Sequence, residues 1–387
     1  MAAMSTPQTP LAGIVVVELG SSVAAPYAGL VLGDLGAEVV KVERAEGDDA
    51  RHWGPPFLDG AAATFQAINR NKRSVVCDLR DPQSRGRLVQ FIVERADVVL
   101  QNMRPGRAEA LGLDSATLCA MKPSLIYCNI GAFGRAGPLA SRPGYDPLMQ
   151  AFGGIMTVVG EEGRPPVRVG PSMIDIGTGL WSVVGILSAL HRRRDTGRGG
   201  VVDTSLFETA AAWMIFYAAH YLASGELPRR RGTAQAGIVP YRGYRTADGD
   251  LMVAGPNDSL YSKLCGVLGH PDWADDPRFR TNPDRVKNAD ALYALIEAEM
   301  PKRTNAEWIA AFDAAGVPCA PVQNVKEMLE HGQTRALDLM QPVPGLSVPL
   351  VGLPISFDGK RPAPRRGPPA LGEATREVLG APVKATS

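Results

Sequence analysis

The stretch "GIVVVELGSSVAAPYAGLVLGDLGAEVVKVE" (residues 13–43) decides the fold. Residues 13–19 are a continuous apolar run typical of a buried strand, residues 25–36 read as a helix, and residues 37–43 form a second apolar run. A strand, a helix and a strand joined by short connections predict a right-handed βαβ unit with parallel strands.

The same alternation continues through about the first 200 residues. Further strands are expected over residues 73–79, 97–102 and 125–133, and a helix over residues 81–96. Such alternation predicts an open, doubly wound α/β sheet, in which ligands bind beyond the carboxyl ends of the strands. The loops expected to form a site therefore begin near Gly20, Glu43, Leu79, Asn102 and Gly131.

The later part of the chain has a different pattern of predicted strands and helices. Residues 241–255, "YRGYRTADGDLMVAG", predict a hairpin turned at Asp248–Gly249, and polar amphipathic helices follow up to residue 330. We expect a smaller α+β domain there. The predicted boundaries are a large domain at 10–205, a linker helix at 206–228 and the small domain at 229–330.

Composition and charge exclude several classes of function. The 387 residues include 41 basic and 40 acidic side chains, a net charge of +1. This charge gives no overall positive potential that would attract nucleic acid or an anionic membrane. The 5 cysteines form no CxxC pair and the 5 histidines no HxxxH, so we expect reduced thiols and no metal. No secretory signal precedes residue 13, and the apolar run 209–224 is too short to span a bilayer. We expect a cytoplasmic enzyme.

One carboxylate stands in an otherwise uncharged run, "VGPSMIDIGTGLWSVVGILSAL" (residues 169–190). The run predicts a helix that is apolar on every side and therefore buried, with Asp175 at its mouth. Two interpretations are open: Asp175 is an N-cap for the helix, or it is a reactive carboxylate shielded from water.

The first loop also permits a nicotinamide enzyme as an alternative. A dinucleotide fold requires GxGxxG, whereas residues 20–29 read "GSSVAAPYAG", with two glycines missing and Pro26 at the start of the helix. An NAD(P)-dependent oxidoreductase is therefore the less favoured interpretation.

Six stretches in order carry a resemblance to a known family: residues 32–51, 69–82, 96–113, 144–154, 170–179 and 191–209. They include "LGDLGAEVVKVERAEGDDAR", "NRNKRSVVCDLRDP", "GYDPLMQAFGG" and "GPSMIDIGTG". The chain resembles the type III CoA-transferases (the CaiB/BaiF family), which include formyl-CoA transferase, carnitine CoA-transferase and α-methylacyl-CoA racemase. This resemblance implies a Rossmann-like large domain, a small domain, a return of residues 331–387 to the large domain, and an interlocked homodimer.

The resemblance places the family's catalytic aspartate on Asp175. In the transferases this carboxylate attacks an acyl-CoA thioester to form a mixed anhydride, then becomes an aspartyl-CoA thioester, and finally passes CoA to a carboxylic acid. An apolar surrounding would exclude water from these intermediates, and the helix dipole would keep Asp175 ionised.

The resemblance also implies a coenzyme A site, with no metal. Its residues map to Val23, Ala24, Arg44, Cys77, Asp78, Leu79, Arg80, Asn102, Met103, Arg104, Arg142, Gly144 and Tyr145. Arg44, Arg80 and Arg104 are candidate phosphate partners because guanidinium groups pair with phosphate. Where the family often has a basic residue this chain has Ala110, and Arg107 is the candidate substitute.

Two further features bear on the reaction. The racemases have a histidine in a "GHD" triplet, whereas Tyr145 occupies that place here, and a phenol is a poor base at neutral pH. A CoA-transferase is therefore favoured over a 2-methylacyl-CoA racemase.

The family's substrate loop maps to Gly232, Thr233 and Gln235. Two interpretations of the arginines at 229–231 and 242 are open: they bind a dicarboxylate such as succinate or glutarate, or they are simply solvated.

Overall fold

The computed structural model describes residues 9–380, in two compact units. One unit holds the chain up to Ile155, Arg168–Gly225 and the chain from Gly332 onward, and the other holds Met156–Val167 and Glu226–His331. Residues 156–167 thus group with the second unit, and residues 206–225 with the first. The domain boundaries expected from the sequence stay predictions.

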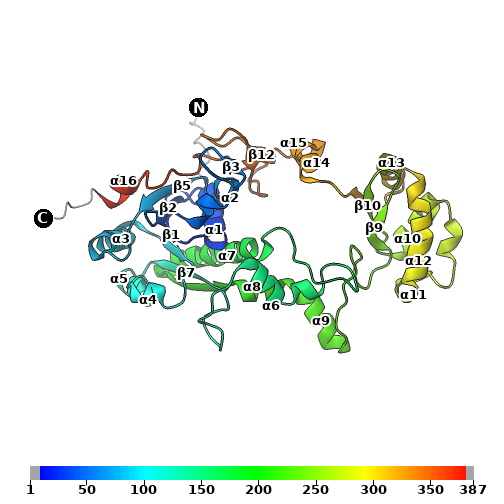
Figure 1. The fold of residues 1–387 in the computed structure, drawn as a ribbon, viewed down its shortest axis with the longest axis horizontal. Coiled ribbons are helices and arrows are strands. Elements are labelled where there is room, and N and C mark those ends of the chain that lie inside the picture. Colours follow the sequence, from blue (N-terminus) through cyan, green and yellow to red (C-terminus); the bar gives the residue numbers. More distant parts are fainter. Residues whose placement is uncertain (1–8, 381–387) are drawn as a thin grey trace. The chain divides into compact units, whose positions relative to one another are not determined.

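A parallel sheet forms the centre of the first unit (Figure 1). Its strands are β1 (Val15–Leu19), β2 (Glu38–Glu43), β5 (Lys72–Val76), β6 (Val98–Gln101), β7 (Ile126–Gly131) and β8 (Gly200–Ser205). They pair in the order β5-β2-β1-β6-β7-β8, and every pair is parallel. This order confirms the predicted doubly wound α/β fold. Successive strands are added outward from β1 on one side and from β6 on the other, so the strand order reverses between β1 and β6. The edge strand β8 was not foreseen, because its alternating exposure breaks the apolar pattern of the central strands.

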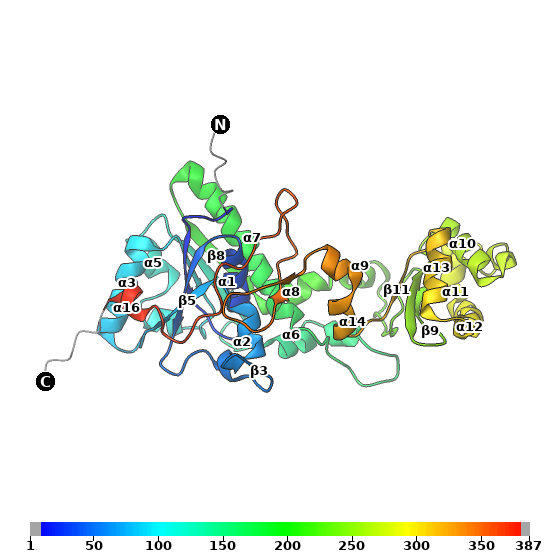
Figure 2. The ribbon, with the colours of Figure 1, turned by 90° about the horizontal axis from the view of Figure 1, so that it is seen from above.

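Helices cover both faces of this sheet (Figure 2). One face carries α1 (Ala24–Asp34) and α7 (Met173–Thr196), and the other carries α3 (Pro82–Arg95), α5 (Ser115–Met121) and α16 (Thr375–Leu379). Leu88 and Ile92 of α3 and Leu118 of α5 are fully buried in a cluster with the sheet residues Val17 and Tyr127. This apolar layer follows from the period-3.6 pattern of α3.

Shorter elements complete the first unit. They are η1 (Asp49–His52), β3 (Phe57–Leu58), β4 (Ala61–Ala62), α2 (Ala63–Ile68), α4 (Arg107–Ala110), α6 (Asp146–Phe152), α8 (Leu206–Trp213), α9 (Ile215–Ser224), α15 (Gly332–Ala336), β12 (Met340–Gln341) and β13 (Leu350–Val351). The short η2 (Ile155–Thr157) begins at the last residue of this segment of the first unit and ends in the second unit. The chain after Gly332 returns to the large sheet, since Thr375 of α16 accepts a hydrogen bond from Val76 N of β5.

The second unit is a small α+β body. It contains β9 (Tyr241–Arg245), β10 (Asp250–Ala254), α10 (Asp258–Leu268), η3 (Pro271–Ala274), α11 (Asn282–Lys287), α12 (Ala289–Glu299), η4 (Met300–Lys302), α13 (Asn305–Ala315), β11 (Cys319–Pro321) and α14 (Val325–Glu330). The antiparallel pairing of β9 with β10 confirms the predicted hairpin. Its core is built from apolar side chains such as Leu251, Leu264 and Trp308.

The prediction that α7 is buried on every side is wrong. Ile174, Val183 and Ile186 are buried against α1 and the sheet, but Trp181 and Val184 on the opposite face are 46% and 51% exposed. The reason is that α7 lies on the outside of the sheet and has a neighbour on one face alone within the first unit. Among residues 9–380, α7 is the one helix long and apolar enough, by length and composition, to cross a membrane.

Glycine lets α7 approach α1 closely. A Cβ at Gly179 would lie 2.8 Å from the carbonyl oxygen of Ala24, at the start of α1. A backbone atom cannot move aside as a flexible side chain can, so a larger residue would force the two helices apart.

We therefore expect Gly179→Ala to lower the free energy of unfolding by about 1–3 kcal/mol, measured by urea denaturation. The matched control is Gly86→Ala in α3, where a Cβ meets nothing within 4 Å. That substitution should instead stabilise the protein by about 0.5–1 kcal/mol, because alanine is the better helix former. Equal effects of the two substitutions would contradict the close-packing argument.

Candidate active site

Two adjoining cavities open where the strands of the large sheet end. The first has a volume of about 600 Å³ and the second about 540 Å³. Both are lined by Leu19, Ser21, Arg44, Asp49 and Met103. These residues follow β1, β2 and β6, so the cavities lie at the reversal point of the sheet, where a doubly wound fold binds ligands.

The structure brings together all the residues predicted to bind CoA. The first cavity is lined by Val23, Ala24, Arg44, Asn102, Met103, Arg104, Arg142, Gly144 and Tyr145, together with Asp175. The second is lined by Arg44, Cys77, Asp78, Leu79, Arg80 and Met103. A single wall therefore connects the predicted nucleophile with the predicted nucleotide-binding residues, and the individual roles of these residues stay predictions.

Asp175 is not the N-cap of α7. The N-cap is Ser172, and Asp175 is the third residue of the helix. The capping oxygen comes from α6 instead: Asp146 Oδ2 accepts hydrogen bonds from Ile174 N at 2.7 Å and Asp175 N at 3.2 Å. The buried carboxylate of Asp146 points to α7 and accepts a hydrogen bond from Gln150 Nε2 at 2.6 Å.

This arrangement raises the basicity of Asp175. Burial, together with the neighbouring Asp146 carboxylate, raises the pKa of Asp175 to about 7. Within residues 9–380, no hydrogen bond to the Asp175 carboxylate is present, because Asp146 takes the amides that the helix offers. With a pKa of about 7, Asp175 is only partly ionised at neutral pH, so the helix dipole does not keep it fully ionised as expected. A half-buried carboxylate with a raised pKa is typical of a catalytic group.

The cavity arginines differ in how far they are already paired. Arg44 pairs with Asp49 and lies 3.6 Å from Glu46, and Arg80 lies 3.1 Å from Asp78. Anionic phosphate would compete with these exposed carboxylates. Arg107 lines the second cavity. It therefore stays the candidate phosphate partner in place of the basic residue that Ala110 replaces.

The predicted substrate loop belongs to the second unit and lines neither cavity. Gly232 N donates to Gly160 O at 2.8 Å, and Thr233 Oγ1 accepts from Gly243 N at 2.9 Å. Gln235 N donates to Tyr241 O at 2.9 Å. These bonds fix the loop within its own unit.

Sequence reasoning missed the charged residues beneath the cavities. Glu18, Lys41 and Asp48 are almost completely buried, and the Asp48 loop lines the second cavity. A signal was present, since Glu18 and Lys41 interrupt runs of valine in strands that a parallel sheet buries on both faces. Among the described residues, no group of His, Cys, Asp and Glu side chains could hold a metal.

The fold and the cavities define a two-unit α/β protein in which a carboxylate of raised pKa lines one cavity, beside a second cavity that is lined by both arginines and carboxylates. A family model for CoA-transferase family III matches residues 11–375. The chain is 35% identical to a succinyl-CoA:glutarate CoA-transferase of Mus musculus, over 96% of this chain and 86% of the relative. It is 38% identical to a succinate–glutarate CoA-transferase of Agrobacterium fabrum, over 98% and 97%.

A solved structure agrees with this match. A CAIB/BAIF family protein from Brucella suis is 40% identical to the chain, covers 96% of it and 98% of its own length, and superimposes with a TM-score of 0.86. The chain belongs to CoA-transferase family III.

Asp175 should make stability depend on pH. Its pKa is raised from 3.8 to about 7 on folding, so the folded chain binds more protons than the unfolded chain between these pH values. The contribution of Asp175 to the stability should therefore fall as pH rises from 4 to 7 and stay level above. Asp175→Asn removes this dependence and should gain up to about 4 kcal/mol relative to the wild type between pH 4 and pH 8, measured by urea unfolding.

Asp146→Asn is the control for the source of this effect. The amide oxygen can still accept from Ile174 N and Asp175 N, but the charge is lost. The pKa of Asp175 should fall, and the pH-dependent loss of stability should shrink without disappearing. A pH dependence identical in the wild type and Asp175→Asn would contradict the assignment.

Proposed function

We propose that the protein transfers CoA from a dicarboxyl-CoA donor to a carboxylic acid through covalent intermediates on Asp175. The observation that carries this proposal is a carboxylate without a hydrogen-bond donor among residues 9–380, lining a cavity that adjoins the predicted CoA groove. Family membership supplies the reaction class, and this carboxylate supplies the nucleophile.

The steps balance without a net proton or an external reagent. An Asp175 oxygen attacks the thioester carbonyl carbon, the C–S bond breaks, and CoA leaves as thiolate. The thiolate attacks the aspartyl carbonyl, which releases the donor acid and leaves an aspartyl-CoA thioester. The acceptor carboxylate attacks the aspartyl carbonyl carbon of this thioester, the C–S bond breaks, and CoA leaves as thiolate from a second mixed anhydride. The thiolate then attacks the acceptor's acyl carbon, the C–O bond breaks, and the acceptor's CoA thioester and free Asp175 result.

The surroundings of Asp175 suit this chemistry. Half-burial limits the access of water, which would hydrolyse the anhydride and the thioester. The pKa of about 7 means that a large share of Asp175 is ionised at neutral pH while the ionised form remains strongly nucleophilic. Arg44, Arg80, Arg104 and Arg107 offer positive charge to the CoA phosphates along the shared wall, and this binding energy positions the thioester.

The names of the relatives support dicarboxylate substrates. Both curated relatives are named for succinate or succinyl-CoA together with glutarate. Of the arginines in the predicted substrate loop, Arg229 lies 3.7 Å from Glu162, and Arg242 lies 3.2 Å from Glu297. Arg230 and Arg231 make no ion pair within the described residues, and the binding of a dicarboxylate by these arginines stays a prediction.

A racemase would need a second acid/base group opposite Asp175. No histidine lines either cavity within the described part of the chain, and Tyr145 in the "GYD" triplet is 59% exposed. These features support transfer over racemisation.

We also propose that the protein acts as a homodimer. Large apolar side chains are exposed on neighbouring helices of the first unit, including Trp181 on α7 and Phe216 and Leu222 on α9, the latter two at 76% and 82%. A second copy of the chain would cover them. Light scattering after size-exclusion chromatography should give twice the chain mass of 41.1 kDa, and a monomer at micromolar concentration would contradict the proposal.

The test of the proposed function is to trap the intermediate. Succinyl-CoA incubated with the protein and then quenched with hydroxylamine should leave a hydroxamate on the peptide that contains Asp175, detected by mass spectrometry. Asp175→Ala should lose the label and at least about 10³-fold in transfer rate, because the covalent route is closed.

Asp49→Asn is a control for the cavity wall, since Asp49 lines both cavities and takes no part in the proposed steps. It should keep the label on Asp175. Transfer by Asp175→Ala near the wild-type rate would overturn the mechanism, and transfer restricted to monocarboxylic acids across a panel of acceptors would overturn the substrate class.

A further inference from the structure

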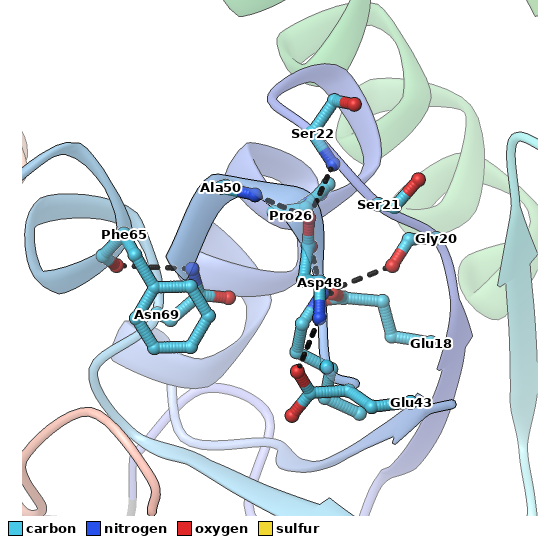
Figure 3. Close-up of polar contacts among 12 residues, drawn as sticks. Glu18, Gly20, Ser21, Ser22, Pro26, Glu43, Asp48, Ala50, Phe65 and Asn69 are labelled. Carbon is cyan, nitrogen blue, oxygen red and sulfur yellow. Dashed lines mark hydrogen bonds and ion pairs between the residues drawn. The ribbon is translucent and has the colours of Figure 1, made fainter. Parts of the chain in front are cut away.

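Four charged side chains are buried together beneath the wall that the two cavities share (Figure 3). Lys41 Nζ on β2 lies 2.9 Å from Glu18 Oε1 on β1 and 2.8 Å from Asp48 Oδ2 in the loop after β2. Lys72 Nζ on β5 lies 2.9 Å from Glu18 Oε2. The two lysines match the two carboxylates in charge, and every one of these side chains is at most 1% exposed.

The electrostatics of the cluster keep its central lysine charged. Burial opposes the charged form, but the Glu18 and Asp48 carboxylates outweigh it and raise the pKa of Lys41 above its ordinary value. The same lysine lowers the pKa of Asp48, against the effect of burial. Lys41 and Asp48 therefore form a permanent ion pair.

Such a cluster is poorly explained by stability alone. Desolvation of buried charges often cancels their attraction, and apolar residues of similar volume frequently serve as well. What distinguishes this cluster is its contact with the backbone of two loops that line the cavities. Lys41 Nζ donates to Gly20 O at 3.0 Å, and Asp48 Oδ1 accepts from Ser22 N at 3.1 Å and Ala50 N at 3.0 Å.

The loop after β1 needs such support. Ser22 has a φ of 69°, a left-handed conformation that is unfavourable for a residue with a Cβ. Backbone strain of this kind persists where surrounding contacts enforce it, and it concentrates at functional sites. Ser22 lines the first cavity together with Val23, Ala24 and Asp175.

We propose that Asp48, oriented by Lys41, is a positioning residue for the CoA thioester. It holds residues 20–23 in the strained conformation that shapes the first cavity beside Asp175, and it holds the 47–50 loop against the second cavity. This inference rests on the proposed function, since it assigns the loop to CoA binding. Asp48 acts through the loop backbone and does not itself touch the reacting atoms.

The chain offers a matched control in the buried pair of Asp34 and Arg70. As whole residues, backbone included, Asp34 is 3% exposed and Asp48 is 4% exposed. The Asp34 carboxylate lies 2.6 Å from Arg70 in the same unit. Neither member of this second pair lines either CoA cavity. Replacing Asp34 therefore breaks a comparable buried ion pair without disturbing the loops.

The experiment compares Asp48→Asn with Asp34→Asn in the full chain, by calorimetric titration with free CoA and by steady-state transfer kinetics. Asp48→Asn should weaken CoA binding by about threefold to tenfold, and Asp48→Ala, which also loses the bonds to Ser22 and Ala50, by more than about tenfold. The loss should appear mainly in KM for acyl-CoA. Asp34→Asn should lower the unfolding midpoint similarly and leave the Kd for CoA within about twofold.

Each outcome decides the matter. The positioning role is supported if Asp48→Asn binds CoA more tightly than Asp48→Ala but less tightly than the wild type, while Asp34→Asn binds CoA like the wild type. Equal Kd values for the wild type and Asp48→Asn, or equal losses in Asp48→Asn and Asp34→Asn, overturn it. If Asp48→Ala does not fold, the comparison of the two asparagine variants decides alone. A wild type that neither binds CoA nor transfers it would instead reject the proposed function.

Discussion

The reversal of strand order between β1 and β6 is the constraint on which the site depends. Parallel strands must be joined by crossovers, and here the crossovers from β1 lead to one side of the sheet while those from β6 lead to the other. The loops after these two strands therefore diverge and leave an opening that no helix fills. Both cavities include residues from the two sides of this gap, Ser21 after β1 and Met103 after β6.

The chemistry of Asp175 comes from how its helix begins. Isolated at a helix N-terminus, a carboxylate would accept backbone hydrogen bonds and become a weaker base. Asp146 occupies that role from the neighbouring helix, so Asp175 gains a negative neighbour and receives no hydrogen bond from the described residues. The fold thus uses one acidic residue to stabilise the helix start and leaves the other free to react.

Much of the fold could be predicted from the sequence, because the central strands are continuous apolar runs and helices such as α3 repeat their apolar residues with the helical period. The edge strand β8 and the exposed face of α7 could not, since both depend on which surfaces find neighbours. Asp175 and the CoA groove were predicted from motifs. The capping by Asp146 was not, because a hydrogen bond between residues 146 and 174 depends on the packing of two helices, which no local pattern encodes.

One group of buried charges lies beneath the cavities. Glu18, Lys41, Glu43 and Asp48 lie on or just after two adjacent strands, at the ends that carry the cavities. The buried pair of Asp34 and Arg70 lines neither cavity, and what distinguishes the first group is its hydrogen bonds to the backbone of the cavity loops. Loops without ladder partners need side-chain donors and acceptors to fix their backbone, and the strands beneath them are the nearest rigid source. The buried ions on the rigid strands therefore hold the backbone of the loops that line the cavities.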